Sequence, residues 1–266
     1  LDIEITTLVY DSRKVEKGSV FVCISGTAVD AHQFIPSAVE AGAAAVIVEK
    51  EVEAAPGVTV VRTPSARSAL AKMSYIYFGR PTDQMITVGV TGTKGKTTTT
   101  HMMKAILEQA GKKVGMVGTN GAYIDGQLYP TKNTTPESYE LMEYFRWMAD
   151  AGCQYMIMEV SSQGIMMHRV DGMIFDYGVF TNISPDHIGP NEHKDFEEYL
   201  YYKSQMLKIC RCGIANMDDE HFSQVTRDHC GRLYTYGINP KADLYIDHVK
   251  FLSEHGFLGI GFDLEG

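Results

Sequence analysis

The chain is predicted to have an α/β fold in which a mostly parallel sheet is flanked by helices. Strand-like and helix-like segments alternate along residues 84–236, at a spacing typical of successive strand–helix–strand units. Near the start of this region, a short apolar run at 85–90 leads into a glycine-rich turn and then into a helix-like stretch at 98–110. Since open parallel sheets bind ligands beyond the carboxyl ends of their strands, we expect the functional site at that edge.

The expected elements divide between a smaller and a larger unit. The smaller α/β unit covers 1–83 and ends in a turn-rich segment at 79–83, and the larger unit covers 84–266. In the smaller unit, the apolar pattern predicts strands at 20–24, 43–48 and 58–61 and helices at 32–41 and 65–78. In the larger unit, the expected strands are 85–90, 113–117, 155–160, 175–180, 213–216 and 232–236, and the expected helices are 98–110, 137–151, 195–209 and 219–228. The tail, 241–266, is strand-like and interrupted by glycines.

Composition is typical of a globular protein and limits the expected partners. The chain has 266 residues, of which 44% are hydrophobic and 21% charged, so it can bury a sizeable core. The net charge of −9 disfavours nucleic-acid binding, since that function favours a basic patch. No run of about 18 apolar residues is present, so no membrane-spanning segment is expected. The five irregularly spaced cysteines suggest no disulfide framework, and a reducing cytoplasm is the expected compartment.

The most informative stretch is the glycine-rich turn, which reads Thr-Gly-Thr-Lys-Gly-Lys-Thr at 91–97. A strand, a glycine loop, Lys-Thr and a helix cradle nucleotide phosphates, because glycines let backbone N–H groups approach the phosphate oxygens. Lys96 can reach the β- and γ-phosphates, and the Thr97 hydroxyl can bind Mg²⁺. The pattern departs from the common P-loop, which has glycine where Val90 stands. A glycine turn without a ligand is the alternative, but Gly-Lys-Thr at a strand-to-helix junction is an uncommon accident.

Further polar residues follow other expected strands. Glu159 closes the strand at 155–160, where it is either a Mg²⁺ ligand near a triphosphate or a solvated carboxylate, and spacing alone does not decide. The segment 181–187, Thr-Asn-Ile-Ser-Pro-Asp-His, offers several polar groups, although a capped turn is the simpler interpretation. Lys203 lies in an expected helix, where a lysine is normally a surface residue. The segment 133–137, Asn-Thr-Thr-Pro-Glu, reads as a capping turn before a helix.

These pieces together resemble the Mur ligase family. The segments that carry the resemblance are 11–15, 18–22, 32–35, 38–48, 91–97, 133–138, 159–162, 168–170, 181–182 and 186–187. They span about 1–240, in order and at plausible spacings. The Thr-Thr-Pro-Glu-Ser and Glu-Val-Ser-Ser segments favour the branch of the family that adds a diamino acid.

The resemblance implies an ATP-dependent amide ligase of peptidoglycan precursor synthesis. The family has a UDP-substrate domain, a P-loop ATPase domain and a C-terminal amino-acid domain, and we expect this chain to be an inactive fragment without the third. A carboxylate of UDP-MurNAc-L-Ala-D-Glu would attack the γ-phosphate, and the amine of L-lysine or meso-diaminopimelate would capture the acyl-phosphate. Two alternatives remain. One is a sister Mur-type or polyglutamate ligase with another acceptor, and the other is a module that binds a nucleotide or a UDP-sugar without ligase activity.

The resemblance also implies roles for individual residues, with ATP and Mg²⁺ as cofactors. The implied catalytic residues are Lys96, Glu159, His187 and Lys203, and the implied metal ligands are Thr97, Glu159, His187 and Lys203. The implied nucleotide-binding residues are Gly92, Thr93, Lys94, Gly95, Lys96, Thr97, Thr98 and Asn182. The implied contacts to the UDP-MurNAc substrate are Ser12, Asn133, Thr134, Thr135, Ser161 and Arg169. Lys203 would be carbamylated, which turns a cation into an oxygen donor for Mg²⁺. Gln163 and Met167 stand where the family commonly has His and Gln. These two differences concern the acceptor and the sugar-side contacts more than the ATPase chemistry.

Overall fold

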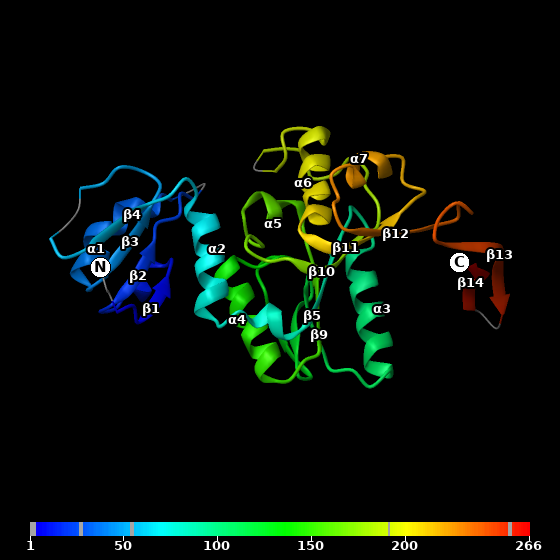
Figure 1. Cartoon of the computed structure of the whole chain (residues 1–266), viewed down its shortest axis with the longest axis horizontal. Helices are drawn as coiled ribbons and strands as arrows, with labels where there is room; N and C mark the ends of the chain where they lie inside the picture. The colour runs from blue at the N-terminus through cyan, green and yellow to red at the C-terminus, as the bar shows by residue number, and fades with distance from the viewer. Residues whose placement is uncertain (1–3, 27–28, 54–55, 191, 255–256) are drawn as a thin grey trace. The chain divides into compact units, whose positions relative to one another are not determined.

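A computed structural model describes residues 4–26, 29–53, 56–190, 192–254 and 257–266 (Figure 1). The chain forms two compact units. The first comprises Leu1–Pro81, Glu137–Arg146 and Met167–Gly172, and the second comprises Thr82–Pro136, Trp147–Met166 and Met173–Gly266. Two segments that are distant in sequence therefore complete the first unit, and the domain division at residue 83 stays a prediction.

The first unit is built on a four-stranded parallel sheet with the strand order β1-β2-β3-β4. Its elements are β1 (Thr7–Val9), η1 (Ser12–Lys14), β2 (Ser19–Val22), η2 (Ala31–Phe34), α1 (Ile35–Glu40), β3 (Ala45–Val48), β4 (Thr59–Arg62) and α2 (Ala66–Tyr77). Alternate residues of β2 enter different apolar clusters, because successive side chains of a strand point to opposite faces. Val20 and Val22 belong to a cluster with Leu70 of α2, whereas Phe21 belongs to one with Ala38 of α1. Apolar clusters thus cover both faces of β2 and β3, as is usual for parallel sheets.

The second unit contains a ten-stranded sheet with the order β14-β13-β12-β11-β10-β5-β9-β6-β7-β8. Its strands are β5 (Ile86–Thr91), β6 (Val114–Gly118), β7 (Gly121–Ile124), β8 (Gln127–Tyr129), β9 (Tyr155–Glu159), β10 (Phe175–Phe180), β11 (Cys210–Asn216), β12 (Arg232–Gly237), β13 (Leu244–Glu254) and β14 (Phe257–Glu265). From β13 to β6 all neighbours pair in parallel, whereas β14, β7 and β8 are antiparallel to their neighbours. The chain fills β6 and β9 on one side of β5 and then β10 and β11 on the other. Open α/β sheets bind ligands at such a reversal of strand order.

Helices cover the parallel part of this sheet (Figure 1). The helix α3 (Lys96–Gln109) packs on β5, β6 and β9, and α6 (Phe196–Lys208) packs on β5, β10 and β11. The shorter helices α5 (Ser162–Met166) and α7 (Phe222–Thr226) pack on α6. Two further helical segments are η3 (Pro81–Gln84) and α4 (Ser138–Asp150). The part of α4 up to Arg146 belongs to the first unit. The core under α3 joins Met103 and Leu107 of the helix to Val88, Val90, Val114, Met116, Ile157 and Val179 of the strands.

The predicted α/β fold, with a mostly parallel sheet flanked by helices, is confirmed, and the differences have local causes. The helix α3 begins at Lys96 rather than at 98, because Gly95 caps it in the left-handed conformation at φ 86°. The hairpin of β7 and β8 was not predicted, although its turn, Asp125-Gly126, carries the Asp-Gly signature of tight hairpins and has φ of 50° and 79°. The helix α7 is shorter than the predicted 219–228.

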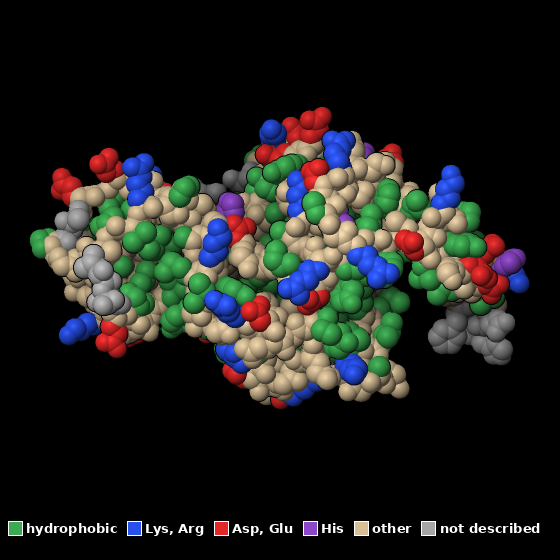
Figure 2. Space-filling view, viewed as in Figure 1, with side chains coloured by type: hydrophobic (Ala, Val, Ile, Leu, Met, Phe, Trp, Pro, Cys, Tyr) green, Lys and Arg blue, Asp and Glu red, His purple; other side chains and the backbone are tan. Residues whose placement is uncertain are grey.

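Apolar side chains remain exposed on two parts of the second unit. On α3, Met102 and Ile106 are 60% and 66% exposed, and Figure 2 shows hydrophobic surface over this helix. On the hairpin of β13 and β14, Phe251 and Leu258 are 87% and 88% exposed. Within the described part of the chain, no helix has the length and apolar character needed to cross a membrane.

Candidate active site

A cavity of about 420 Å³ opens where the central strands of the second unit end. It is lined by Thr93, Lys94, Gly95, Lys96, Thr97, Thr98, Thr119, Thr134, Glu159 and His187. Most of these residues lie at the end of, or soon after, β5, β6, β9 and β10, which are neighbours in the sheet. The fold therefore gathers most of the predicted nucleotide-binding and metal-binding residues at the edge where this fold class binds ligands.

The loop between β5 and α3 has a backbone that requires glycine at two positions. Gly92 has φ +149°, and a Cβ there would lie 1.9 Å from Thr181 Oγ1. Gly95 has φ +86° and precedes the first residue of α3. The first amides of a helix have no intrahelical partners, and the helix dipole favours negative charge beside them. The loop and the start of α3 therefore form the kind of site that binds phosphate groups.

The ammonium group of Lys96 folds back over this loop. Its Nζ donates to the carbonyl oxygens of Gly92 at 2.8 Å and Thr93 at 3.2 Å. Burial is the main cause that lowers the pKa of Lys96, and the nearby Glu159 carboxylate partly opposes it. A bound phosphate would act on this pKa in the same direction as Glu159, because an anion stabilises the charged form of the lysine.

Glu159 ends β9 and is almost fully buried, with an exposed fraction of 1%. Its Oε2 accepts hydrogen bonds from Thr97 Oγ1 at 3.0 Å and Thr119 Oγ1 at 3.2 Å, and its Oε1 accepts the backbone N–H of Thr119 at 2.9 Å. A Cβ on Gly118 would lie 2.2 Å from Glu159 Oε1, so any other residue at this position of β6 would force the carboxylate to move. The predicted metal ligands Thr97 and Glu159 are thus in direct contact, and Glu159 is not the solvated carboxylate of the alternative interpretation.

The segment that follows β10 contacts the loop between β5 and α3, residues 92–95, through several polar groups. This loop is called the phosphate loop below. Asn182 Oδ1 accepts the backbone N–H of Lys94 at 2.9 Å, and its Nδ2 donates to the Lys94 carbonyl at 3.0 Å. Lys94 Nζ lies 2.9 Å from Asp186 Oδ2, and this hydrogen bond is the main cause that lowers the pKa of Asp186. His187 lines the cavity with φ 53°, and its Nδ1 lies 3.1 Å from Glu192 Oε1. The segment is therefore more than a capped turn, because its side chains hold the loop.

Lys203 is buried, which corrects the expectation from sequence alone that a helical lysine lies at the surface. Only 1% of it is exposed, because it lies on the inner face of α6. Its Nζ donates to the Gly92 carbonyl at 2.9 Å and lies 4.8 Å from the centre of the Tyr199 ring. Burial, and then the charge of Lys96, hold the pKa of Lys203 well below its usual value. Lys203 thus lies beneath the loop rather than among the residues that line the cavity.

Four of the six predicted substrate contacts lie in the second unit: Asn133, Thr134, Thr135 and Ser161. Thr134 lines the cavity, and its Oγ1 lies 3.1 Å from Thr119 Oγ1. Asn133 is exposed. Thr135 is fully buried, donates to the Glu159 carbonyl at 3.0 Å and accepts the Ser161 N–H at 3.0 Å. The side chain of Thr135 therefore supports the end of β9, while the role of the others toward a substrate stays a prediction.

The other two predicted substrate contacts, Ser12 and Arg169, lie in the first unit. Ser12 begins the 3₁₀ turn η1. Arg169 donates from Nε at 3.0 Å and from Nη2 at 2.7 Å to Glu137 Oε1. Arg67 donates from Nη1 to Glu137 Oε2 at 3.0 Å. One carboxylate thus orients two guanidinium groups, which suit anionic ligands because of their forked geometry.

Sequence reasoning missed two residues that build the site. Thr119 lines the cavity and makes two of the hydrogen bonds to Glu159. Thr119 could have been predicted, because it comes just after the predicted strand 113–117. The carboxyl end of that strand lies at the same edge of the sheet as the carboxyl ends of the other parallel strands. Tyr199, whose hydroxyl lies 3.0 Å from Thr93 Oγ1, had no such signal because it reads as an ordinary core aromatic residue of a helix.

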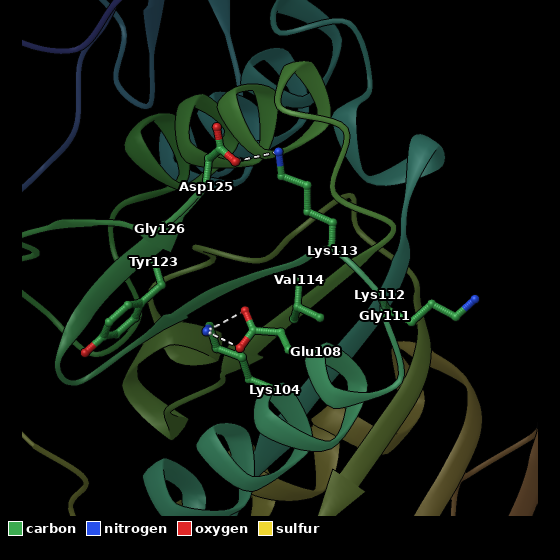
Figure 3. Close-up of a pocket in the computed structure, with 9 residues that line it drawn as sticks. All are labelled: Lys104, Glu108, Gly111, Lys112, Lys113, Val114, Tyr123, Asp125 and Gly126. Carbon is green, nitrogen blue, oxygen red and sulfur yellow. Dashed lines mark hydrogen bonds and ion pairs between the residues drawn. The ribbon is translucent and has the colours of Figure 1, made fainter.

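A second cavity, of about 320 Å³, lies near the start of β6, away from the phosphate loop. Figure 3 shows its ion pairs, Lys104 with Glu108 and Lys113 with Asp125. Because these charged groups already pair with one another, this cavity lacks the converging set of free polar groups that marks a ligand site.

Family comparisons agree with this architecture. The Mur ligase middle domain matches residues 90–258, and the Mur ligase family catalytic domain matches residues 4–76. A UDP-N-acetylmuramoyl-L-alanyl-D-glutamate–2,6-diaminopimelate ligase of Caldanaerobacter subterraneus is 40% identical over 250 residues, which cover 94% of this chain and 52% of the relative. A ligase of the same name from Clostridium acetobutylicum is 40% identical over 99% of this chain and 54% of its own length. The chain thus spans about half the length of these relatives.

Solved structures show the same fold. A UDP-N-acetylmuramoyl-L-alanyl-D-glutamate–2,6-diaminopimelate ligase superposes with a TM-score of 0.84 at 25% identity, covering 98% of this chain and 53% of the other. A MurF ligase from Thermotoga maritima in complex with ADP gives a TM-score of 0.59 at 19% identity, and the match covers 98% of this chain and 59% of the MurF chain.

The chain is thus an α/β protein whose glycine-rich loop, of the kind that binds phosphate groups, lies at the switch point of its sheet. The middle-domain match covers more than half of the residues, and the chain belongs to the Mur ligase family.

We predict that Gly118→Ala displaces the Glu159 carboxylate and weakens binding of Mg²⁺-nucleotide by at least about 10-fold, because one lost charged contact is worth roughly 1.5–3 kcal/mol. Titration calorimetry with ATP and Mg²⁺ measures the effect. Gly259→Ala is the matched control, since a Cβ at that position would meet no described atom within 4 Å and the φ of this glycine is not positive. Equal affinities for both variants would show that the Gly118–Glu159 approach does not shape the site.

Proposed function

We propose that this chain is the part of an ATP-dependent ligase that holds ATP and UDP-N-acetylmuramoyl-L-alanyl-D-glutamate, and that the ligase attaches 2,6-diaminopimelate. Relatives at 40% identity carry this activity in their names. The observation that carries the proposal is the cavity in which the phosphate loop, Lys96 and the contact between Thr97 and Glu159 meet. We place the reaction in the cytoplasm, in peptidoglycan precursor synthesis, and expect a monomer.

The donor set of the cavity fits a magnesium–nucleotide complex. The start of α3 and the ammonium of Lys96 suit phosphate oxygens. The Thr97 hydroxyl and the Glu159 carboxylate supply hard oxygen ligands. The described residues contain no group of three or more His, Cys, Asp or Glu that could hold a metal by themselves. This suits Mg²⁺, which is usually held by one or two carboxylates together with the phosphates of its substrate. When bound, ATP would supply the phosphoryl group that activates the substrate carboxylate.

The residues of this chain would act chiefly by position and charge. Lys96 and the first amides of α3 would neutralise the phosphates, and Asn182 would keep the loop in its shape through both of its hydrogen bonds to Lys94. His187, at the rim of the cavity, would help to hold a second Mg²⁺. Because a fixed loop need not reorganise when charge develops, this preorganisation lowers the barrier to phosphoryl transfer.

The first unit would bind the UDP-MurNAc substrate through Ser12 and Arg169. The support is the position of the Arg169 guanidinium, which Glu137 holds through two hydrogen bonds. A guanidinium that is fixed in this way loses little freedom on binding, and guanidinium groups suit phosphates and carboxylates because of their forked geometry.

We further propose that Lys203 becomes carbamylated and then serves as a Mg²⁺ ligand. A neutral lysine amine adds to CO₂, forming an N–C bond and releasing one proton. Burial favours the neutral amine of Lys203, because it lowers the pKa of that residue. The carbamate nitrogen would keep one N–H, so the hydrogen bond to the Gly92 carbonyl could persist.

If Lys203 is carbamylated, the carbon NMR spectrum of the protein equilibrated with ¹³C-bicarbonate should contain one additional carbonyl resonance. The signal should fade as the pH falls, since protonated lysine does not react. It should be missing in Lys203→Ala and present in Lys112→Ala, which changes an exposed lysine. A spectrum of the unchanged protein without this resonance would leave Lys203 as an uncharged or cationic tether of the loop.

Lys96→Ala is expected to weaken ATP binding by about 10- to 100-fold, because a charge-assisted hydrogen bond is worth roughly 1.5–3 kcal/mol. In the full-length enzyme it should abolish ATP turnover. Titration calorimetry measures the affinity, and Lys112→Ala again serves as the exposed control. Retained affinity in Lys96→Ala would place the phosphate site elsewhere.

The acceptor is tested with a protein of the relatives' full length, supplied with ATP, Mg²⁺, UDP-MurNAc-L-Ala-D-Glu and one amino acid at a time. We expect meso-diaminopimelate to give both phosphate release and a product of increased mass. If L-lysine but not meso-diaminopimelate supports turnover, the acceptor is L-lysine. Turnover with another amine would indicate a sister ligase. No turnover with either diamino acid would refute the proposed function.

A further inference from the structure

The helix α6 contacts the phosphate loop through two buried side chains that lie one helical turn apart. Tyr199 and Lys203 are 0% and 1% exposed, and residues four apart lie on one face of a helix. The Tyr199 hydroxyl lies 3.0 Å from Thr93 Oγ1, and Lys203 Nζ donates to the Gly92 carbonyl at 2.9 Å. Successive residues of the loop are thus held from the same helix.

The Thr93 hydroxyl lies in a small network of hydrogen bonds that includes Tyr199. Thr93 Oγ1 accepts the backbone N–H of Ser184 at 3.0 Å and lies 3.3 Å from the Ser184 carbonyl, to which it donates. A hydroxyl has one proton and two lone pairs, so the Thr93 hydroxyl can also form a hydrogen bond with Tyr199, in which either oxygen can be the donor. Burial raises the pKa of Tyr199 to about 12, so this hydroxyl keeps its proton at neutral pH. The Thr93 hydroxyl thus has polar partners on two elements, Ser184 and Tyr199.

The ring of Tyr199 is held in place on several sides. The ammonium of Lys203 lies 4.8 Å from its centre, and the ring of His193 lies 5.3 Å from it, centre to centre. His193 is itself fully buried, and its Nε2 lies 2.8 Å from the hydroxyl of Ser162. Ser162 comes three residues after Glu159, so the position of the tyrosine depends on the strand that carries the carboxylate.

We propose that Tyr199 is a positioning residue of the nucleotide site and acts through Thr93. The backbone N–H of Thr93 donates to the Asn182 carbonyl at 2.8 Å, and the hydroxyl contact with Tyr199 anchors the same residue from the side of α6. Together they hold the loop in the shape that its amides need to meet phosphate oxygens. The inference rests on the proposed function, because it takes the ligand of the cavity to be a nucleotide.

The test compares Tyr199→Phe, which removes only the hydroxyl, with Tyr201→Phe, which makes the same change at a residue of α6 that is 55% exposed. Titration calorimetry measures the affinity for Mg²⁺-ATP, and thermal melting measures stability. We expect Tyr199→Phe to weaken ATP binding by about 5- to 10-fold, the worth of one neutral hydrogen bond, and Tyr201→Phe to leave it unchanged.

A double-mutant cycle separates positioning from a general structural effect. In a Thr93→Val background, Tyr199→Phe should have little further effect on ATP affinity, because its partner is already lost. Additive losses, or unchanged affinity in Tyr199→Phe, would overturn the inference. If Tyr199→Phe melts below the assay temperature, Thr93→Val removes the same contact without altering α6, and unchanged ATP affinity there would also overturn it. Failure of the unaltered chain to bind ATP would instead refute the proposed nucleotide site, and the inference with it.

Discussion

The candidate site depends on the close contact between Gly92 and the end of β10. A Cβ on Gly92 would lie 1.9 Å from Thr181 Oγ1 and 3.0 Å from the Asn182 carbonyl oxygen, so the two backbones meet without a side chain between them. Thr181 Oγ1 donates to the Lys94 carbonyl at 2.8 Å, and Asn182 bonds both backbone groups of Lys94. The loop is therefore shaped by its neighbouring strand before any ligand binds. Such preorganisation reduces the ordering cost of binding.

The same contact concentrates positive charge in a protein whose overall charge is negative. The net charge of the chain is −9, yet Lys96 and Lys203 both donate to the single carbonyl oxygen of Gly92. Each ammonium is partly or fully removed from water, and the charge of Lys96 lowers the pKa of Lys203 further. Burying a positive charge is costly, and an anion bound at the loop would offset that cost. Local charge, rather than the field of the whole protein, is therefore what would attract a phosphate here.

Carboxylates at the site and in the first unit serve two different purposes. Glu159 accepts hydrogen bonds from Thr97 and Thr119, which leaves it beside a hydroxyl that can share a metal. Glu137, in the first unit, instead holds Arg67 and Arg169. The first arrangement favours a hard cation, and the second favours an anionic group on a ligand. The two carboxylates thus have different partners, hydroxyl groups in the second unit and guanidinium groups in the first.

The fold class and the phosphate loop could be predicted from the amino-acid sequence, because both follow from short-range patterns. Alternating apolar segments indicated a parallel sheet, and Gly-Lys-Thr at a strand end indicated an anion site. Which residues meet depends on contacts between distant segments, and these appear only in the folded chain. Glu159 could not be told from a solvated carboxylate, because its partners Thr97 and Thr119 are 62 and 40 residues away. Lys203 read as a surface lysine, because its burial depends on how α6 packs against β5 and β10. Tyr199 had no signal at all, since its contact with Thr93 spans 106 residues and exists only once the sheet has assembled.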